Sequence, residues 1–185
     1  MQVEFIKGIV GTDPLLSDTK PHIVCAGRSN VGKSSVINAI VGSKIARSSA
    51  TPGKTREINF FLVDAKRYLV DLPGYGYARL SQKAREKLRK HLLWYLFESG
   101  APIVRAAIVI DAQVGLKPFD EELLAAFREH GTPFLIIANK EDKLTQKEKH
   151  RLKESLKAQG LLENTLFMSA KTGRGKDAVR AELFG

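Results

Sequence analysis

Residues 27–34 read Gly27-Arg28-Ser29-Asn30-Val31-Gly32-Lys33-Ser34, which fits the pattern G-x-x-x-x-G-K-[ST]. They directly follow the apolar run His22 to Ala26 and precede a helical pattern, the strand-to-helix context that this pattern requires. Such glycines let consecutive backbone N–H groups turn inward around phosphate oxygens. Lys33 can bring a positive charge to the β and γ phosphates, and Ser34 can offer a hydroxyl to Mg²⁺. A chance glycine turn would match in only about one in a hundred such chains, so we predict a nucleoside triphosphate site.

Short apolar runs alternate with helical patterns from residue 22 to the end of the chain, as in strands joined by crossover helices. We therefore predict a three-layer α/β fold, with a six-stranded, mostly parallel sheet and helices on both faces. The predicted strands are His22 to Ala26, Ile58 to Val63, Arg67 to Asp71, Val104 to Ile110, Phe134 to Asn139 and Thr165 to Met168. The second and third should pair antiparallel across Asp64-Ala65-Lys66. Val3 to Ile9 is expected to add an edge strand.

Three segments between these runs are predicted to form helices. In the first, apolar residues recur at every fourth position and basic residues lie on the other face. The recurring apolar residues are Ala84, Leu88, Leu92 and Leu96. The second should run from Pro118 to His130, with acidic residues in its first turn. Thr145 and Glu148 have the spacing of a capping box, which opens a third helix continuing to about Gly160.

The composition predicts one globular domain. With 185 residues and 43% hydrophobic content, the chain can bury one sizeable core. We expect a single domain over 1–185, with its core at about 22–185 and an N-terminal extension at 1–21. No apolar run approaches the roughly 20 residues of a membrane span, and Met1 to Val10 lacks a signal-peptide core. We therefore expect a cytoplasmic protein that does not enter the membrane.

Basic residues exceed acidic ones, giving a net charge of +10 and a pI of about 9.8. The excess is concentrated at 79–91 and 143–157. Such a balance favours binding to a polyanion such as nucleic acid, although solvated helix faces would explain it equally well. The single cysteine, Cys25, lies in an apolar run, which excludes an intrachain disulfide and indicates a buried, inert thiol.

The base that accompanies the triphosphate is indicated by Asn139-Lys140-Glu141-Asp142, where a predicted buried strand meets a polar loop. The carboxylate of Asp142 can accept hydrogen bonds from N1–H and the 2-amino group of guanine, whereas adenine offers no such pair of donors. Sites of this kind can discriminate by ~10⁴-fold. Lys140 can lay its aliphatic stem along the base, and Asn139 can tie this loop to residues 27–34. A solvated loop is the alternative interpretation, which the phosphate-binding pattern disfavours.

Three further segments fit the same ligand. In Asp71-Leu72-Pro73-Gly74, the carboxylate can hold Mg²⁺ through a water while the Gly74 N–H reaches the γ-phosphate, so this run is predicted to sense that phosphate. Thr51-Pro52-Gly53-Lys54-Thr55 contains two hydroxyls that could complete the Mg²⁺ shell, and we choose Thr55. Ser169-Ala170-Lys171 follows the last predicted strand and offers backbone N–H groups to the guanine O6.

Together these five segments resemble the guanine-nucleotide motifs of translation-factor-like P-loop GTPases, in family order, over about residues 22–175. More narrowly, residues 27–35, 51–55 and Asp71-Leu72-Pro73-Gly74-Tyr75-Gly76-Tyr77-Ala78 resemble the EngB family of ribosome-biogenesis GTPases, in the TrmE-Era-EngA-EngB class. This resemblance implies a Ras-like fold, GTP and GDP as ligands with Mg²⁺, and GTP hydrolysis. It also implies a role in assembly of the large ribosomal subunit and in normal cell division and septation. Asn139 departs from the threonine usual in that family, which does not threaten guanine recognition.

The resemblance also implies particular site residues. Catalytic roles fall to Lys33, Thr55 and Gly74, and Mg²⁺ ligation falls to Ser34 and Thr55. The implied nucleotide-binding residues are Gly27, Arg28, Ser29, Asn30, Val31, Gly32, Lys33, Ser34, Gly53, Lys54, Thr55, Arg56, Glu57, Asp71, Leu72, Pro73, Gly74, Asn139, Lys140, Glu141, Asp142, Met168, Ser169 and Ala170.

Tyr75 bears on the rate of hydrolysis. Many Ras-like GTPases place a glutamine directly after D-x-x-G to orient the attacking water, and a tyrosine cannot replace that amide. We therefore predict slow intrinsic hydrolysis that a partner or a monovalent cation accelerates. By resemblance to potassium-activated relatives, the cation would be K⁺ and Asn30 a candidate ligand.

The leading hypothesis is a GTP-driven switch whose GTP state docks on the large ribosomal subunit, its rRNA or a precursor particle. We expect a monomer and no binding to DNA. A signalling or trafficking switch is the runner-up, and the final residues, Ala181 to Gly185, offer no cysteine for prenylation. A P-loop kinase or ATPase is disfavoured by the guanine-reading loop.

Overall fold

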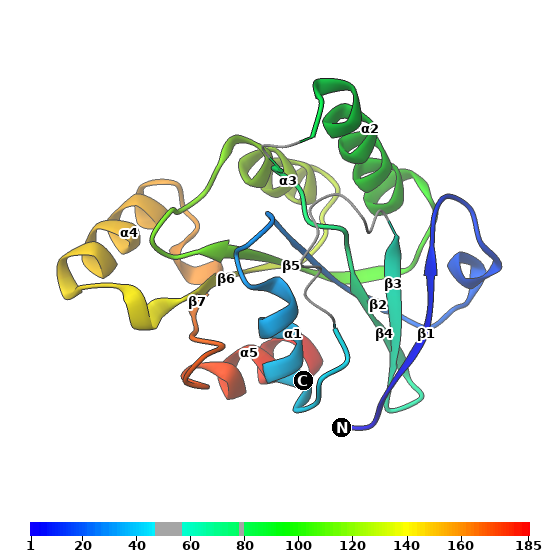
Figure 1. The fold of residues 1–185 in the computed structure, drawn as a ribbon, viewed down its shortest axis with the longest axis horizontal. Coiled ribbons are helices and arrows are strands. Elements are labelled where there is room, and N and C mark those ends of the chain that lie inside the picture. Colours follow the sequence, from blue (N-terminus) through cyan, green and yellow to red (C-terminus); the bar gives the residue numbers. More distant parts are fainter. Residues whose placement is uncertain (47–56, 78–79) are drawn as a thin grey trace.

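A computed structural model of the chain describes residues 1–46, 57–77 and 80–185 and contains a seven-stranded sheet (Figure 1). Its strands are β1 (Val3–Ile9), β2 (His22–Gly27), β3 (Ile58–Val63), β4 (Arg67–Asp71), β5 (Ile103–Asp111), β6 (Phe134–Asn139) and β7 (Thr165–Phe167). Their order across the sheet is β1-β3-β4-β2-β5-β6-β7. Strand β2 pairs parallel with β4 and β5, and β6 pairs parallel with β5 and β7. The predicted antiparallel pairing of β3 with β4 is confirmed, as is the extra edge strand β1.

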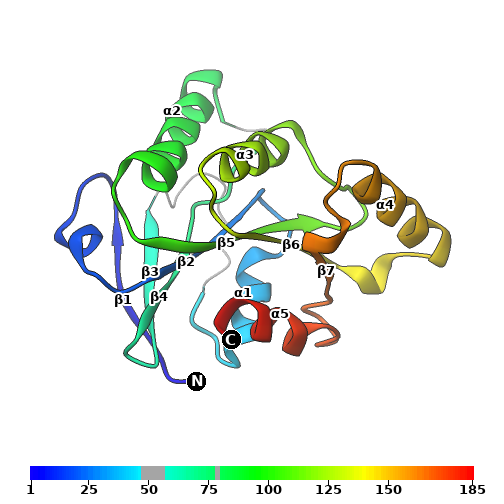
Figure 2. The ribbon, with the colours of Figure 1, turned by 180° about the vertical axis from the view of Figure 1, so that it is seen from behind.

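Helices cover both faces of this sheet, as predicted (Figures 1 and 2). One face carries α1 (Lys33–Val41) and α5 (Lys176–Phe184), and the other carries α2 (Gln82–Leu93), α3 (Pro118–Glu129) and α4 (Gln146–Ala158). The periodic pattern that ends at Leu96 continues past α2 as a π-helical turn, Trp94–Glu98. Short 3-10 turns lie at Pro14–Ser17, Glu141–Lys143 and Leu162–Asn164. The predicted capping box opens α4, where Thr145 N donates to Glu148 Oε2 at 2.8 Å.

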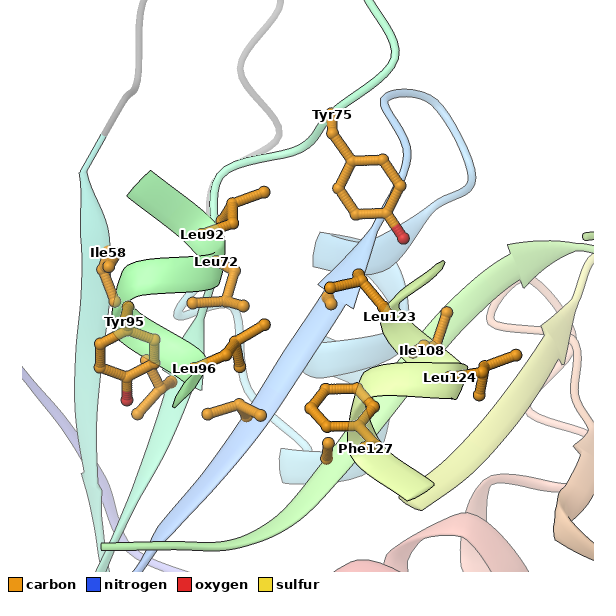
Figure 3. Packing of buried hydrophobic residues seen from close by; sticks show 14 of the residues in the cluster. Ile58, Leu72, Tyr75, Leu92, Tyr95, Leu96, Ile108, Leu123, Leu124 and Phe127 are labelled. Atoms are coloured by element: carbon orange, nitrogen blue, oxygen red, sulfur yellow. The ribbon is translucent and has the colours of Figure 1, made fainter. Parts of the chain in front are cut away.

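The central strands are buried on both faces because helices cover each side of a parallel sheet. In β2, Val24 and Ala26 face the α2–α3 layer, whereas Cys25 faces α1 and α5. Ile108 of β5 packs with Phe127 of α3 in the first of these layers (Figure 3). The burial of Cys25 raises the pKa of its thiol to about 12, which agrees with the predicted inert cysteine.

The N-terminal residues contribute to the core instead of extending beyond it. Strand β1 pairs along β3, and Ile9 and Leu16 are buried in the same cluster as the α2–α3 layer. The hydroxyl of Tyr68, in β4, donates to Asp18 at 2.8 Å. Residues 1–21 therefore cover apolar surface that β3 and β4 would otherwise expose. Among the described residues, no helix is both long and apolar enough to cross a membrane.

A buried histidine should make the stability of this core depend on pH. His22 is 0% exposed, its Nδ1 lies 3.0 Å from the hydroxyl of Tyr95, and its Nε2 has no hydrogen-bond partner among the described residues. Burial lowers the pKa of His22 from 6.5 to about 4, although nearby Asp18 raises it somewhat. Between these values the unfolded chain binds a proton that the folded chain does not. Stability should thus be complete above about pH 6.5 and fall by roughly 3 kcal/mol as the pH drops to about 4.

We expect the double variant His22→Phe, Tyr95→Phe to lose this part of the pH dependence, because it removes both polar partners together. Urea unfolding at several pH values would measure the effect. The exposed His150, changed to Gln, is the matched control and should keep the wild-type dependence. If the free energy of unfolding changed with pH in the same way for the wild type and the double variant, the prediction would be contradicted.

Candidate guanine-nucleotide site

The phosphate loop joins the end of β2 to the start of α1. Asn30 and Gly32 both adopt left-handed backbone conformations, with φ of 67° and 89°. Gly32 is the N-cap of α1, so the first backbone N–H groups of that helix face the loop. At Gly27, a Cβ would lie 2.7 Å from the carbonyl oxygen of Val109, so that position has no room for a side chain. The loop therefore has the glycine-dependent shape that its pattern predicts.

A cavity at this loop brings the phosphate pattern and the D-x-x-G run together. Lys33 and Asp71, which both line the cavity, are buried and form an ion pair. The cavity is lined by Arg28, Ser29, Asn30, Gly32, Lys33, Ser34, Ser35, Asn59, Asp71, Leu72, Pro73, Gly74 and Tyr77. Ser35, Asn59 and Tyr77 were not among the predicted site residues. For Asn59, its polar side chain within an otherwise apolar strand was the one signal that could have identified it as a site residue.

The oxygen donors at this cavity fit Mg²⁺ bound chiefly through phosphates. Asp71 offers a buried carboxylate and Ser34 a hydroxyl, and both are hard oxygen donors. In the part of the chain that the structure describes, no cluster of three or more His, Cys, Asp or Glu side chains could hold a metal. Mg²⁺ usually takes one or two protein oxygens and keeps phosphates and waters for the rest, so this donor set suits it.

Asn139 ties its own loop to the phosphate loop, as predicted, and it also contacts the loop after β7. Its Nδ2 donates to the carbonyl oxygen of Val31 at 2.9 Å, and its Oδ1 accepts from Ala170 N at 3.0 Å. The side chain is only 2% exposed. One amide therefore holds the phosphate loop, the end of β6 and the loop after β7 in a single arrangement.

The side chain of Lys140 extends from residues 139–142, which we call the base-reading loop, to the phosphate loop. Its Nζ donates to the carbonyl oxygen of Asn30 and to Asp111 Oδ2, both at 2.7 Å. Asp111, at the end of β5, was not predicted as a site residue. These two contacts fix the end of the Lys140 side chain between the phosphate loop and the end of β5.

The carboxylates of Asp142 and Glu141 lie in different environments. Asp142 is exposed, and its Oδ1 accepts from Ser169 Oγ at 2.6 Å, a hydrogen bond that lowers the pKa of the carboxyl. Glu141 is instead buried in an ion pair with Lys149, so its carboxylate serves the structure of the loop. Met168 packs in the core, and its carbonyl oxygen accepts from Glu141 N at 3.1 Å. Only Asp142 of the two acidic residues is free to face a base.

Tyr75 points away from the phosphate cavity. It is 4% exposed and is drawn among the core residues in Figure 3, and its hydroxyl donates to Asp120 Oδ1 of α3 at 2.5 Å. Its ring meets Phe119 edge to face, with centroids 4.7 Å apart. Burial raises the pKa of both Tyr75 and Asp120. From the sequence, Asp120 was expected only to stabilise the first turn of α3, and no local pattern pairs it with Tyr75.

One predicted nucleotide-binding residue lies away from the cavity, and others fall outside the residues that the structure describes. Glu57 is exposed, and its side chain lies beside Gly8 of β1. Thr51 to Thr55 and Arg56, which include the predicted Mg²⁺ ligand Thr55, fall outside the described residues.

Substituting alanine at Gly32 should weaken GTP binding at least tenfold. A Cβ there would lie 2.5 Å from Nδ2 of Asn139, on backbone with a φ of 89°. The phosphate loop would then separate from the base-reading loop. Gly42→Ala is the matched control, because that glycine caps the other end of α1 with a φ of 78° and has nothing within 4 Å of its Cβ position. The left-handed backbone should cost each variant about 1–2 kcal/mol of stability, and the clash with Asn139 should add to the loss in Gly32→Ala. Only Gly32→Ala should lose affinity, as measured by calorimetry. Equal GTP affinities would contradict this.

Comparison with known proteins finds similar GTP-binding proteins. A family model described as 50S ribosome-binding GTPase matches residues 22–140. The probable GTP-binding protein EngB of Aquifex aeolicus (strain VF5) is 44% identical over 163 residues, covering 88% of this chain and 89% of that relative. The crystal structure of a probable GTP-binding protein engB has a TM-score of 0.72 and 27% identity, covering 88% of this chain and 96% of that one.

A more distant solved structure shows the same fold with ligands. It is Era in complex with MgGDPNP and nucleotides 1506–1542 of 16S ribosomal RNA, at 25% identity and a TM-score of 0.66. The similarity covers 89% of this chain but 56% of that one.

Proposed function

Because this chain belongs to the EngB family of GTP-binding proteins, we propose that it is a Mg²⁺-dependent switch in assembly of the large ribosomal subunit. It is a GTPase, as its family is. The observation that carries the proposal is Asn139, whose side chain joins the phosphate loop to the loops that present Asp142 and Ala170. That link supports the proposal, because one nucleotide could then contact both the phosphate loop and a carboxylate suited to guanine.

The residues around the cavity have separate tasks in this proposal. Lys33 and the backbone N–H groups of the phosphate loop hold the phosphates, and Asp142 selects guanine. Ser34 and Asp71 would hold Mg²⁺, with Thr55 as the further ligand, and the ion would neutralise charge on the phosphate oxygens. Lys33 and Asp71 lie against each other, so the groups proposed to meet the phosphates and Mg²⁺ are side by side.

Slow intrinsic hydrolysis is part of the proposal. The hydroxyl of Tyr75 donates to Asp120, so the side chain after D-x-x-G is turned away from any attacking water. We expect single-turnover hydrolysis to be slow in NaCl and faster in KCl or with ribosomal subunits, with Asn30 as the proposed cation ligand. Equal and fast rates in every condition would defeat this part of the proposal.

Ribosomal docking is supported by the family description, 50S ribosome-binding GTPase, and by the RNA-bound structure of Era. The exposed basic residues of α2 would face rRNA, and the protein would act in the cytoplasm, with effects on cell division and septation following from ribosome assembly. Sedimentation with purified subunits under a GTP analogue, GDP or no nucleotide tests the proposal. Binding to the large subunit should be strongest with the analogue and should weaken with salt, and no binding in any state would overturn it.

A further inference from the structure

A second cavity lies behind the phosphate loop, in the groove between α2 and α3. Its volume is about 440 Å³, within the ~300–1,000 Å³ typical of small-ligand sites. The floor is apolar and is made by the ring of Tyr75, the side chain of Leu88 and the ring of Phe119. We call it the α2–α3 groove.

The rim of the α2–α3 groove is positively charged. Arg28, Arg85 and Lys117 line it, and the side chains of these three form no ion pair in the described part of the chain. The two carboxylates of the groove, Glu86 and Glu122, are both paired with Arg89. The net charge offered to a ligand is therefore positive.

Arg28 connects this groove to the nucleotide. It lines both the α2–α3 groove and the phosphate cavity. At Gly76, a Cβ would lie 2.8 Å from Arg28 Nε, so the guanidinium packs directly on the chain after D-x-x-G. Ser29 N also donates to the carbonyl oxygen of Tyr75 at 2.7 Å. An occupant of the groove would thus touch residues that flank both phosphate-binding segments.

We propose that the α2–α3 groove binds a single-stranded segment of RNA, with one unstacked base on the apolar floor and the adjoining phosphates on Arg28, Arg85 and Lys117. This inference rests on the proposed function, in which the partner is an RNA-rich particle, and it names the surface that meets the RNA. Proteins recognise unpaired RNA by the same combination of an apolar base pocket and basic side chains on the backbone.

Charge favours RNA over an acidic protein segment as the occupant. The same helix carries exposed Lys83, Lys87 and Lys90, so the positive surface extends along α2 beyond the groove. A nucleic acid backbone supplies a regular row of negative charges that can follow this surface, whereas one acidic side chain would use only the rim. Guanidinium groups such as that of Arg85 also suit phosphates and base faces.

Two variants test the groove, each with a matched control. Gln82→Trp fills the groove from the exposed first residue of α2, and Gln146→Trp places the same bulk on the exposed first residue of α4. Arg85→Ala removes a rim cation, and Lys147→Ala removes an exposed cation from α4. The probe is a fluorescent single-stranded RNA of about ten nucleotides, titrated by anisotropy across salt concentrations, with GTP binding measured in parallel.

We expect Gln82→Trp and Arg85→Ala to weaken RNA binding at least fivefold, while the controls and GTP affinity stay at wild-type values. The slope of log affinity against log salt should fall by about 0.7 for Arg85→Ala, the value of one phosphate contact on a single strand. A 4-thiouridine in the probe should crosslink to residues 75–77 or 117–122. Unchanged RNA binding in both groove variants, or equal losses in the controls, would overturn the inference.

The subunit experiment separates this inference from the proposed function. If both groove variants still sediment with the large subunit as the wild type does, the groove is not the RNA surface but the switch proposal stands. If crosslinking on the particle joins the groove to a ribosomal protein, an acidic protein segment is the occupant and the RNA inference is wrong. If the wild type binds no subunit, the proposed function fails first.

Discussion

Replacing Asp142 by asparagine should weaken GTP binding by about 10⁴-fold and improve binding of xanthosine triphosphate. The carboxylate accepts from two guanine donors, whereas an amide would present donors of its own to them. The loop itself should survive, because an asparagine Oδ1 can still accept the hydrogen bond that Ser169 Oγ donates to Asp142 at 2.6 Å. Competition between the two nucleotides, measured by calorimetry, would show the change in preference from GTP to xanthosine triphosphate.

The control for this change is Asp177→Asn, which removes an exposed carboxylate from the first turn of α5. It should leave both affinities unchanged. If Asp142→Asn bound GTP as the wild type does, the guanine assignment of this loop would be refuted.

Replacing Lys33 by methionine should lower the hydrolysis rate by about 10²–10³-fold, the loss seen when one preorganised donor to a reacting oxygen is removed. It should also destabilise the protein by about 3 kcal/mol, since Asp71 would remain buried without its partner. Single-turnover hydrolysis and urea unfolding measure the two effects separately.

A double variant separates chemistry from stability. Adding Asp71→Asn to Lys33→Met removes both buried charges, so stability should largely return. Hydrolysis should stay slow, because Lys33 and the proposed Mg²⁺ ligand Asp71 are then both missing. Lys44→Met, an exposed lysine just beyond α1, is the control and should change neither. Recovery of hydrolysis in the double variant would show that Lys33 acts only through folding.

Residues near one another in sequence were predicted well from their pattern. The strands β3, β4 and β6 have the predicted bounds, and Thr145 caps α4 as its spacing with Glu148 indicates. These features depend on apolar periodicity and on contacts within a few residues, both of which a sequence displays directly. The phosphate and base-reading segments could be recognised for the same reason, since each is a short run at the end of a strand.

The pairings between distant residues were decided only in the folded chain. The sequence could not show that Glu141 is buried against Lys149 while Asp142 faces outward, or that Tyr75 meets Asp120. It predicted the edge strand at Val3 to Ile9, but it gave no sign that Leu16 joins the core or that Arg28 lines a second cavity. Local pattern establishes which residues can perform chemistry, but the order of strands and the packing of helices determine which of them meet, because those contacts join positions that no short-range spacing relates.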